Sequence, residues 1–302
     1  MVIQLKKNKT KINEKAKYGV CALCTKEREL KLSHRIPKAI GAIIKKDSFT
    51  KRLRSVHDPD TPLQDLDKEY MLCGECEQRF STRETLFIQK VLRPFRNKRN
   101  TKLEYDSWLY YFIVSLSWRS LYHDSLDEKK FLENGFTKKQ FDKLKLTESR
   151  MREYLLGNSK GVLYIENHLI FLDECTDIKG YGVIPYSRFC NAAFGYVFGN
   201  NTSGTLYVFH ILAGILVITV IQKDSTDKYK NTYVKNGKGK FNKEQNVKSK
   251  VIDSEVLGYV PGQLEQARIK FSEKEKSKLL KKIEKNPDGF LKSSSSIRYR
   301  EE

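Results

Sequence analysis

Two Cys-x-x-Cys pairs are the residues of this chain whose spacing most clearly predicts chemistry. The first pair is Cys21 and Cys24, and the second is Cys73 and Cys76. A turn of this kind presents two thiolates to one tetrahedral ion, and two turns complete a four-cysteine zinc site. Closing the loop of almost fifty residues between the pairs costs about 3–4 kcal/mol. Structural zinc contributes about 10–16 kcal/mol in small zinc fingers. We therefore predict one structural zinc ion bound by these four thiolates.

A redox role is the alternative for a Cys-x-x-Cys pair. It requires one such pair at the start of a helix in a thioredoxin-like unit, and two copies around a long insert do not fit that pattern. Six cysteines in 302 residues are also too few for a disulfide-stabilised secreted protein. Residues 1–17 lack the apolar stretch of a secretory signal, so we expect a cytoplasmic location.

Polar residues follow each cysteine pair, and any chemistry of this segment is expected there. Residues 33–38 read SHRIPK, and Glu77 directly follows Cys76. A neutral histidine can accept a proton from water, and a carboxylate is a suitable ligand for Mg²⁺ or Mn²⁺. Guanidinium and ammonium groups can bind a phosphate.

In residues 18–90 this combination resembles the HNH, or ββα-metal, endonuclease family, which is built on a treble clef. In that family a zinc knuckle precedes a strand with a dipeptide that ends in His, and a second Cys-x-x-Cys pair opens a helix. The resemblance implies that His34 is the general base, and that Ser33 and Glu77 occupy the ligand positions of a catalytic Mg²⁺ or Mn²⁺. Arg35 or Lys38 would then hold the neighbouring phosphate of a nucleic acid.

The sequence departs from the family pattern in two places. The family has an Asn upstream of the second cysteine pair, and residues 65–70 (DLDKEY) contain none. Ser33 is also a weaker ligand for a hard divalent ion than Asp or His would be. Two alternatives follow. Either His57, Asp58 or Asp65 supplies the missing ligand, or the protein has lost the catalytic metal and kept only the scaffold.

The charge balance predicts a polyanionic partner. There are 57 Lys and Arg residues against 37 Asp and Glu residues, which gives a formal net charge of +20. Such an excess favours nucleic acid or an anionic membrane surface as the partner, although solvated surface lysines alone can also produce it. The basic segments 1–17, 93–102 and 228–250 are not interleaved with aromatics, which favours contact with the phosphate backbone over base stacking.

Three functions are compatible with these observations. The leading hypothesis is metal-dependent cleavage of DNA, with RNA less favoured, in bacterial defence or mobile-element biology. The second is a catalytically silent, zinc-stabilised nucleic-acid-binding protein. The third is a subunit whose C-terminal domain binds another protein.

The remaining sequence predicts an α+β protein in which a basic arm at 1–17 precedes two domains. Residues 18–99 form the HNH-like treble-clef domain, and residues 100–302 form a helical and then β-rich domain with a basic loop at 224–250. Apolar periodicity predicts helices at 105–122 and 129–156, and a charged helix at 272–284 precedes a polar tail. Ser81, with Glu84 three residues later, predicts the start of a helix that Pro94 ends or kinks.

Residues 206–221 (LYVFHILAGILVITVI) form the most apolar stretch of the chain. The stretch is shorter than the roughly 20 residues that a membrane helix needs. It is rich in β-branched and aromatic residues, and Ala213-Gly214 lies at its middle. We therefore expect two buried strands joined by a tight turn and no membrane span.

Overall fold

The computed structural model describes residues 17–98, 100–172, 175–178 and 186–300. It combines helices and strands, as an α+β fold requires. The predicted basic arm lies outside the described residues, except for Lys17.

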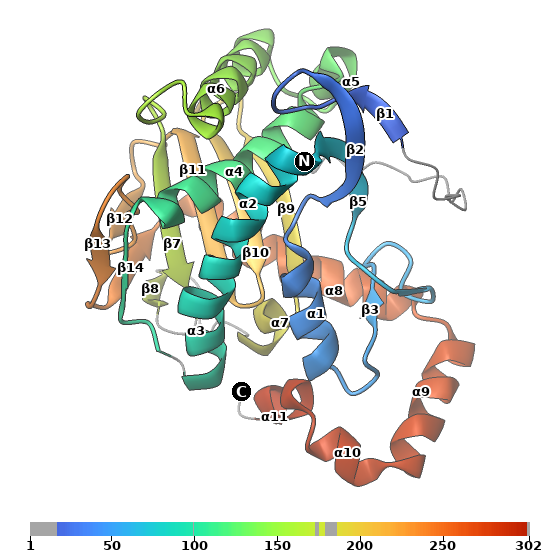
Figure 1. Ribbon diagram of the computed structural model, residues 1–302. Coiled ribbons are helices and arrows are strands. Elements are labelled where there is room, and N and C mark those ends of the chain that lie inside the picture. Colours follow the sequence, from blue (N-terminus) through green and yellow to red (C-terminus); the bar gives the residue numbers. More distant parts are fainter. Residues whose placement is uncertain (1–16, 99, 173–174, 179–185, 301–302) are drawn as a thin grey trace.

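A four-stranded antiparallel sheet lies at the centre of the fold (Figure 1). Its strands, in spatial order, are β7 (Glu166–Phe171), β11 (Ile215–Gln222), β10 (Leu206–Leu212) and β9 (Ala193–Gly199). The turn between β10 and β11 contains Ala213 and Gly214, whose φ values are 53° and 100°. The predicted pair of buried strands is therefore confirmed. Alternate residues of β10 and β11 enter two separate hydrophobic clusters, which explains why their sequence is continuously apolar.

Helix α4 (Ser107–Asp124) packs against one face of this sheet and also contacts α2 (Gly74–Phe87) and α6 (Lys138–Leu156). Most of its residues are buried, as the predicted apolar helix requires. The predicted helix at 129–156 is divided in two. Helix α5 (Glu128–Glu133) ends before Gly135, which has a φ of 86°. The side chains of Thr137 and Gln140 then form a capping box that starts α6.

The other face of the sheet is covered by Tyr229 and Val247 of the 224–250 segment and by the π-helical turn η2 (Ile252–Gly258), which leads into α8 (Tyr259–Lys270). The prediction of a basic loop here was wrong. The segment contains the short strands β12 (Lys228–Lys230), β13 (Gly239–Phe241) and β14 (Gln245–Lys248). β12 and β14 form a sheet with β8 (Cys175–Ile178), and β13 pairs with β6 (Leu103–Tyr105).

Buried residues scattered among the lysines hold this segment in place. Phe241 and Val247 are buried, and the Gln245 side chain bonds to the backbone of Phe171 and Leu169. These few buried groups hold the segment against the rest of the fold despite its high lysine content. Each lysine of a strand can keep its charged end on the solvent side.

The N-terminal part contains a three-stranded sheet in which β2 (Glu27–His34) lies between β1 (Lys17–Val20) and β5 (Lys68–Cys73). The insert between β2 and β5 holds α1 (Lys38–Asp47) and the two-stranded ladder of β3 (Leu53–Arg54) and β4 (Pro62–Leu63). Helix α2 follows β5 without a loop.

The predicted start of the helix after the second cysteine pair was wrong. It begins at Gly74 and not at Ser81, whose hydroxyl donates to the Gln78 carbonyl inside the helix. Of the two effects predicted for Pro94, ending the helix is contradicted, because the π-helical turn η1 (Ile88–Leu92) leads directly into α3 (Arg93–Lys98), while kinking it stays a prediction. The π turn shifts the hydrogen-bond pattern just before the proline, which has no N–H to donate.

The predicted division at residue 99 remains a prediction, but the two parts share one hydrophobic cluster. Phe87 of α2 stacks on Phe112 of α4 with ring centroids 4.2 Å apart. Phe80 of α2 meets the ring of Trp118 edge to face. The N-terminal part is therefore packed directly onto the central helix.

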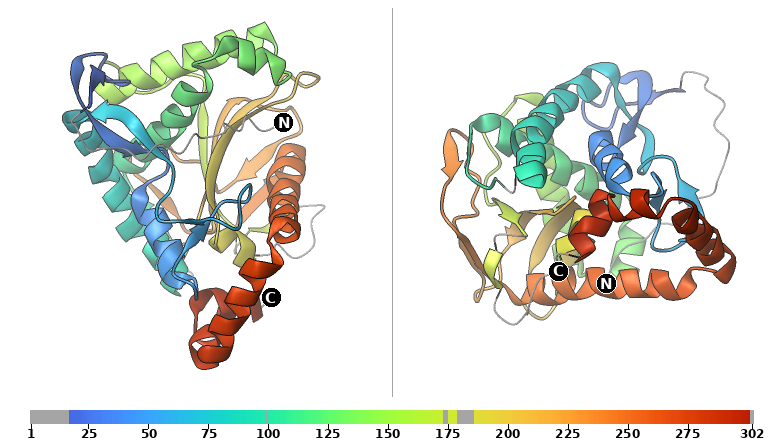
Figure 2. Two further views of the ribbon diagram at one scale, coloured as in Figure 1. Left: turned by 90° about the vertical axis from the view of Figure 1, so that its right-hand side faces the viewer. Right: turned by 90° about the horizontal axis from the view of Figure 1, so that it is seen from below.

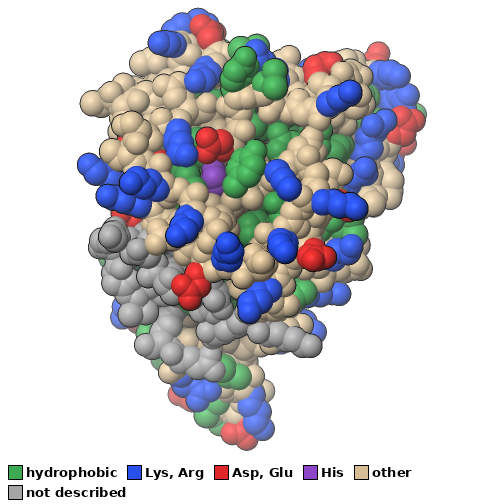
Figure 3. Space-filling view, turned by 90° about the vertical axis from the view of Figure 1, so that its left-hand side faces the viewer, with side chains coloured by type: hydrophobic (Ala, Val, Ile, Leu, Met, Phe, Trp, Pro, Cys, Tyr) green, Lys and Arg blue, Asp and Glu red, His purple; other side chains and the backbone are tan. Residues whose placement is uncertain are grey.

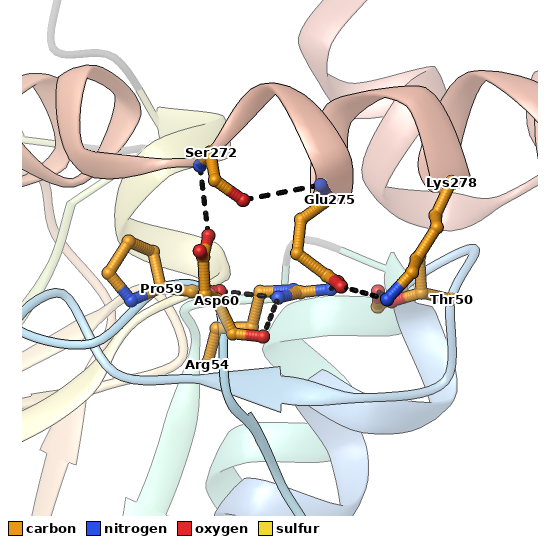
Figure 4. A network of polar contacts seen from close by, with 8 residues as sticks. Thr50, Arg54, Pro59, Asp60, Ser272, Glu275 and Lys278 are labelled. Atoms are coloured by element: carbon orange, nitrogen blue, oxygen red, sulfur yellow. Dashed lines mark hydrogen bonds and ion pairs between the residues drawn. The ribbon is translucent and has the colours of Figure 1, made fainter.

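The C-terminal helices lead back to the N-terminal part (Figure 2). They are α9 (Glu273–Lys285), α10 (Pro287–Leu291) and α11 (Ser294–Arg300). The predicted charged helix corresponds to α9, but the predicted polar tail contains two further helices. Figure 4 shows the contacts that attach α9: the Ser272 amide donates to Asp60, and the Arg54 guanidinium contacts the Asp60 carbonyl and the Glu275 carboxylate.

Candidate functional site

The four paired cysteines converge on one point. Cys21 and Cys24 lie on the turn between β1 and β2, while Cys73 ends β5 and Cys76 lies in the first turn of α2. Pairing of β2 with β5 places Leu30 opposite Cys73, which brings the turn to the start of the helix. One sulfur atom from each cysteine lies within 4.8 Å of the other three. This cluster can hold a metal ion such as zinc.

The sulfur geometry and surroundings fit a tetrahedral ion. A zinc–sulfur bond of about 2.3 Å requires sulfurs about 3.8 Å apart, and the Cys24 and Cys73 sulfurs are 3.9 Å apart. A disulfide requires about 2.05 Å, and all four cysteines are free. The Cys73 amide donates to the Cys21 sulfur at 3.3 Å. A hydrogen bond from Cys76 lowers the pKa of Cys21 and raises the pKa of Cys76.

The structure brings Ser33 and Glu77 together. Ser33 is fully buried on β2, and its hydroxyl donates to Glu77 Oε2 at 2.7 Å. Glu77 lies in the first turn of α2, one residue after Cys76, where a carboxylate also interacts favourably with the helix dipole. The cysteine cluster therefore fixes Glu77 against the strand that carries Ser33.

His34 faces away from Ser33, because successive side chains of a strand point to opposite faces. Its Nε2 atom is buried and lies 3.0 Å from Asp65 Oδ2, although the contact is not aligned as a hydrogen bond. Burial opposes ionisation of Asp65, but contact with His34 and the charge of Lys68 outweigh this effect and lower the pKa of Asp65. With Nε2 enclosed against a carboxylate, Nδ1 is the nitrogen that can meet water or a substrate.

Arg35 and Lys38 have different surroundings. The Arg35 guanidinium is paired with Asp124 at 3.4 Å, and Asp124 also contacts His123. Lys38 is exposed at the first residue of α1. Lys38 is therefore the freer of the two to meet a phosphate.

Of the three residues considered as substitutes for the weak ligand Ser33, only Asp65 contacts His34. His57 and Asp58 are exposed on the loop between β3 and β4. Within the residues that the structure describes, the four cysteines are the only group of three or more His, Cys, Asp or Glu side chains close enough to share an ion. Glu77 can therefore give a divalent ion one carboxylate ligand.

Sequence reasoning missed Arg119, which links this site to the central helix. Its buried guanidinium donates to the His34 carbonyl at 2.7 Å and to Glu84 Oε1 at 2.6 Å. It also lies over the Phe80 ring. An arginine inside an otherwise apolar helix was the available signal, because a buried cation requires partners.

A basic surface lies on the face of the molecule that includes β12 to β14 (Figure 3). Lys228, Lys230, Lys240 and Lys248 are exposed there. Tyr233 is also 51% exposed. Tyr229 stacks on His168 and lies 5.3 Å from Lys223 Nζ. The interpretation that this segment lacks aromatics was wrong, since both tyrosines lie within it.

Comparison with known proteins gives no matching family model, no matching curated protein and no matching solved structure. No helix in the described part of the chain has the length and apolar character to cross a bilayer.

Proposed function

We propose that this chain is a metal-dependent endonuclease of the HNH type that acts on DNA in preference to RNA. The pairing of His34 with Asp65, at the end of the strand that follows the first cysteine turn, is the observation that carries the proposal. A hairpin, a returning strand and a helix that opens at the second cysteine pair are also the parts of a treble clef. The net charge of +20 supports a polyanionic substrate.

The chemistry assigns a separate task to each residue. His34 accepts a proton from the water that attacks the phosphodiester, and Asp65 holds the ring and stabilises the imidazolium that forms. A Mg²⁺ or Mn²⁺ ion would stabilise charge on the phosphorane and the leaving oxygen. On the His34 face of β2 the carboxylate available to such an ion is Asp65, because Glu77 lies with Ser33 on the opposite face. Lys38 is placed to bind a neighbouring phosphate, and the zinc ion has a structural role only.

A second function is favoured by the surroundings of Ser33. Its hydroxyl is buried and donates to Glu77, so one oxygen of the Glu77 carboxylate is already engaged. A zinc-stabilised protein that binds nucleic acid without cleaving it would have this arrangement. The exposed lysines of the β12 to β14 face and Tyr233 would then supply the contacts.

A plasmid-nicking assay distinguishes the two functions. We expect the zinc-loaded chain to nick DNA with Mg²⁺ or Mn²⁺ and to stop when EDTA is added. Substitution of His34→Ala should lower the rate about 10²–10⁴-fold, the usual contribution of a general base. Substitution of His57→Ala is the matched control, because His57 is an exposed loop histidine.

Each other result has a defined meaning. Cleavage that survives His34→Ala removes this residue from the mechanism. If the wild type does not nick DNA but binds it with an affinity that falls steeply with salt, the binding function replaces the enzymatic one. Zinc content is measured after EDTA treatment, so that loss of the structural ion is not mistaken for loss of a catalytic ion.

A further inference from the structure

A pocket of about 600 Å³ lies where three segments distant in sequence meet. The segments are the C-terminal end of α1, helix α3 and helix α11. Four cationic residues line it, namely Lys46, Arg93, Arg96 and Arg298. Asp47 is the one acidic residue among the described residues of the lining. The lining therefore has a clear excess of positive charge.

Asp47 and Arg96 hold the three segments around this pocket together. The Arg96 side chain is only 4% exposed, and it donates to Asp47 and to the carbonyls of Cys190 and Ala213. Arg298 Nη2 donates to the same oxygen of Asp47 at 3.0 Å. One carboxylate thus joins α1, α3 and α11, and Arg96 has little remaining capacity to bind a ligand.

The other three cations retain that capacity. Lys46 and Arg93 are exposed, and neither has an ion-pair partner in the described part of the chain. Arg298 bonds to Asp47 and Asn191 through Nη2, which leaves Nη1 available. Holding several cations around one pocket is unfavourable unless an anion binds between them.

We propose that this pocket binds a phosphate group. Arginine forks match the oxygens of phosphate, and lysine adds a point charge. The pocket is larger than one phosphate, so the group belongs to a nucleotide or to a nucleic-acid backbone. The ten residues of α1 separate it from the His34 site by about 15 Å. It is therefore a second site and does not depend on the proposed cleavage reaction.

Calorimetric titration of the full, zinc-loaded chain with inorganic phosphate tests this proposal, with chloride at equal ionic strength as the reference. We expect one saturable site per chain. The double variant Lys46→Gln, Arg93→Gln should bind at least about tenfold more weakly, since each charged hydrogen bond contributes that order of affinity. The matched control, Lys129→Gln with Lys145→Gln, removes the same charge from exposed positions on α5 and α6.

Unchanged affinity in the pocket variant, or an equal loss in the control, overturns the proposal. A nucleoside monophosphate and a short single-stranded oligonucleotide are then tested as competitors of phosphate. If the pocket substitutions abolish this competition, the site is supported, and the competitor identifies the source of the phosphate. If the substitutions leave the competition unchanged, the proposal is overturned. His34→Ala should retain phosphate binding, so failure of the cleavage proposal and failure of this one are separate results.

Discussion

The four-cysteine unit, formed by β1, β2, β5 and α2, differs from the central four-stranded sheet in what stabilises it. In β1, Tyr18 is 71% exposed and Val20 is 64% exposed, so this strand buries little apolar surface. In β10 every residue is buried. The sheet is stabilised by apolar burial on both faces, whereas the turn beside β1 depends on the convergence of four sulfur atoms.

This difference predicts that the two regions respond independently to substitution. Loss of the metal ligands should release β1 and the cysteine turn without opening the sheet. A cavity in the sheet should lower global stability without changing the metal content. The candidate site lies in the first region but is attached to the second through Arg119, so substitutions at their contact measure how far the two are coupled.

Substitution of a cysteine ligand should have the largest effect. We expect Cys76→Ser to reduce the zinc content from one ion per chain to none, with a loss on the order of 10 kcal/mol of metal-binding free energy. Amides of β1 and β2 should then exchange rapidly with solvent. Metal analysis and hydrogen exchange measure both effects. Cys190→Ser, at a buried cysteine outside the cluster, is the control and should retain zinc.

A cavity in the sheet should have the next largest effect. Phe209 is 1% exposed on β10, and Phe209→Ala should lower the free energy of unfolding by about 3–5 kcal/mol. Denaturant unfolding measures this loss. The zinc content of the folded variant should stay at the wild-type value, and a parallel loss of zinc would show that the two regions are not independent.

Removal of the linking arginine should have an intermediate effect. Arg119→Met leaves the Glu84 carboxylate and the His34 carbonyl without their donor, and should lower the free energy of unfolding by about 2–3 kcal/mol. If the link also positions His34, phosphodiester cleavage should fall more than stability explains. Arg79→Met, at an exposed position on α2, should change neither quantity.

The pH dependence due to Asp65 should be the smallest effect. Its pKa is lower in the folded chain than in the unfolded one, so its contribution is complete above the unfolded pKa and is lost as pH falls through the folded pKa. Asp65→Asn should therefore cost stability at neutral pH, by about 1 kcal/mol or less. The difference from wild type should disappear in acid. A constant difference across both conditions would contradict the role of the carboxylate charge.

The apolar pattern of the sequence predicted several elements correctly, because the residues that set the local structure of these elements are also the ones that pack in the core. Strands β10 and β11 and helix α4 were predicted because all three are buried on nearly all sides, so their sequences are almost continuously apolar. The start of α2 was predicted seven residues late, because Ser81 matches a capping pattern. The strand that ends at Cys73 fixes the start of the helix instead, and a local sequence rule does not include that strand.

The composition of 224–250 gave the wrong prediction for a related reason. A high lysine content is typical of a loop, but a few residues, including Phe241 and Val247, determine that the segment packs on the sheet. The basic pocket could not be predicted at all. Lys46, Arg93 and Arg298 belong to three segments whose proximity depends on the return of the C-terminal helices.

By themselves, the residue types and their spacing determined that four thiolates form one cluster, because tetrahedral coordination imposes a short-range pattern on the chain. The resemblance to HNH endonucleases added His34 and Glu77 as candidates. Only the tertiary structure decided that His34 contacts Asp65, that Ser33 contacts Glu77, and that Arg119 reaches both parts of the molecule. Those contacts join residues separated by 31 to 85 positions, and such pairings are set by packing of the whole chain.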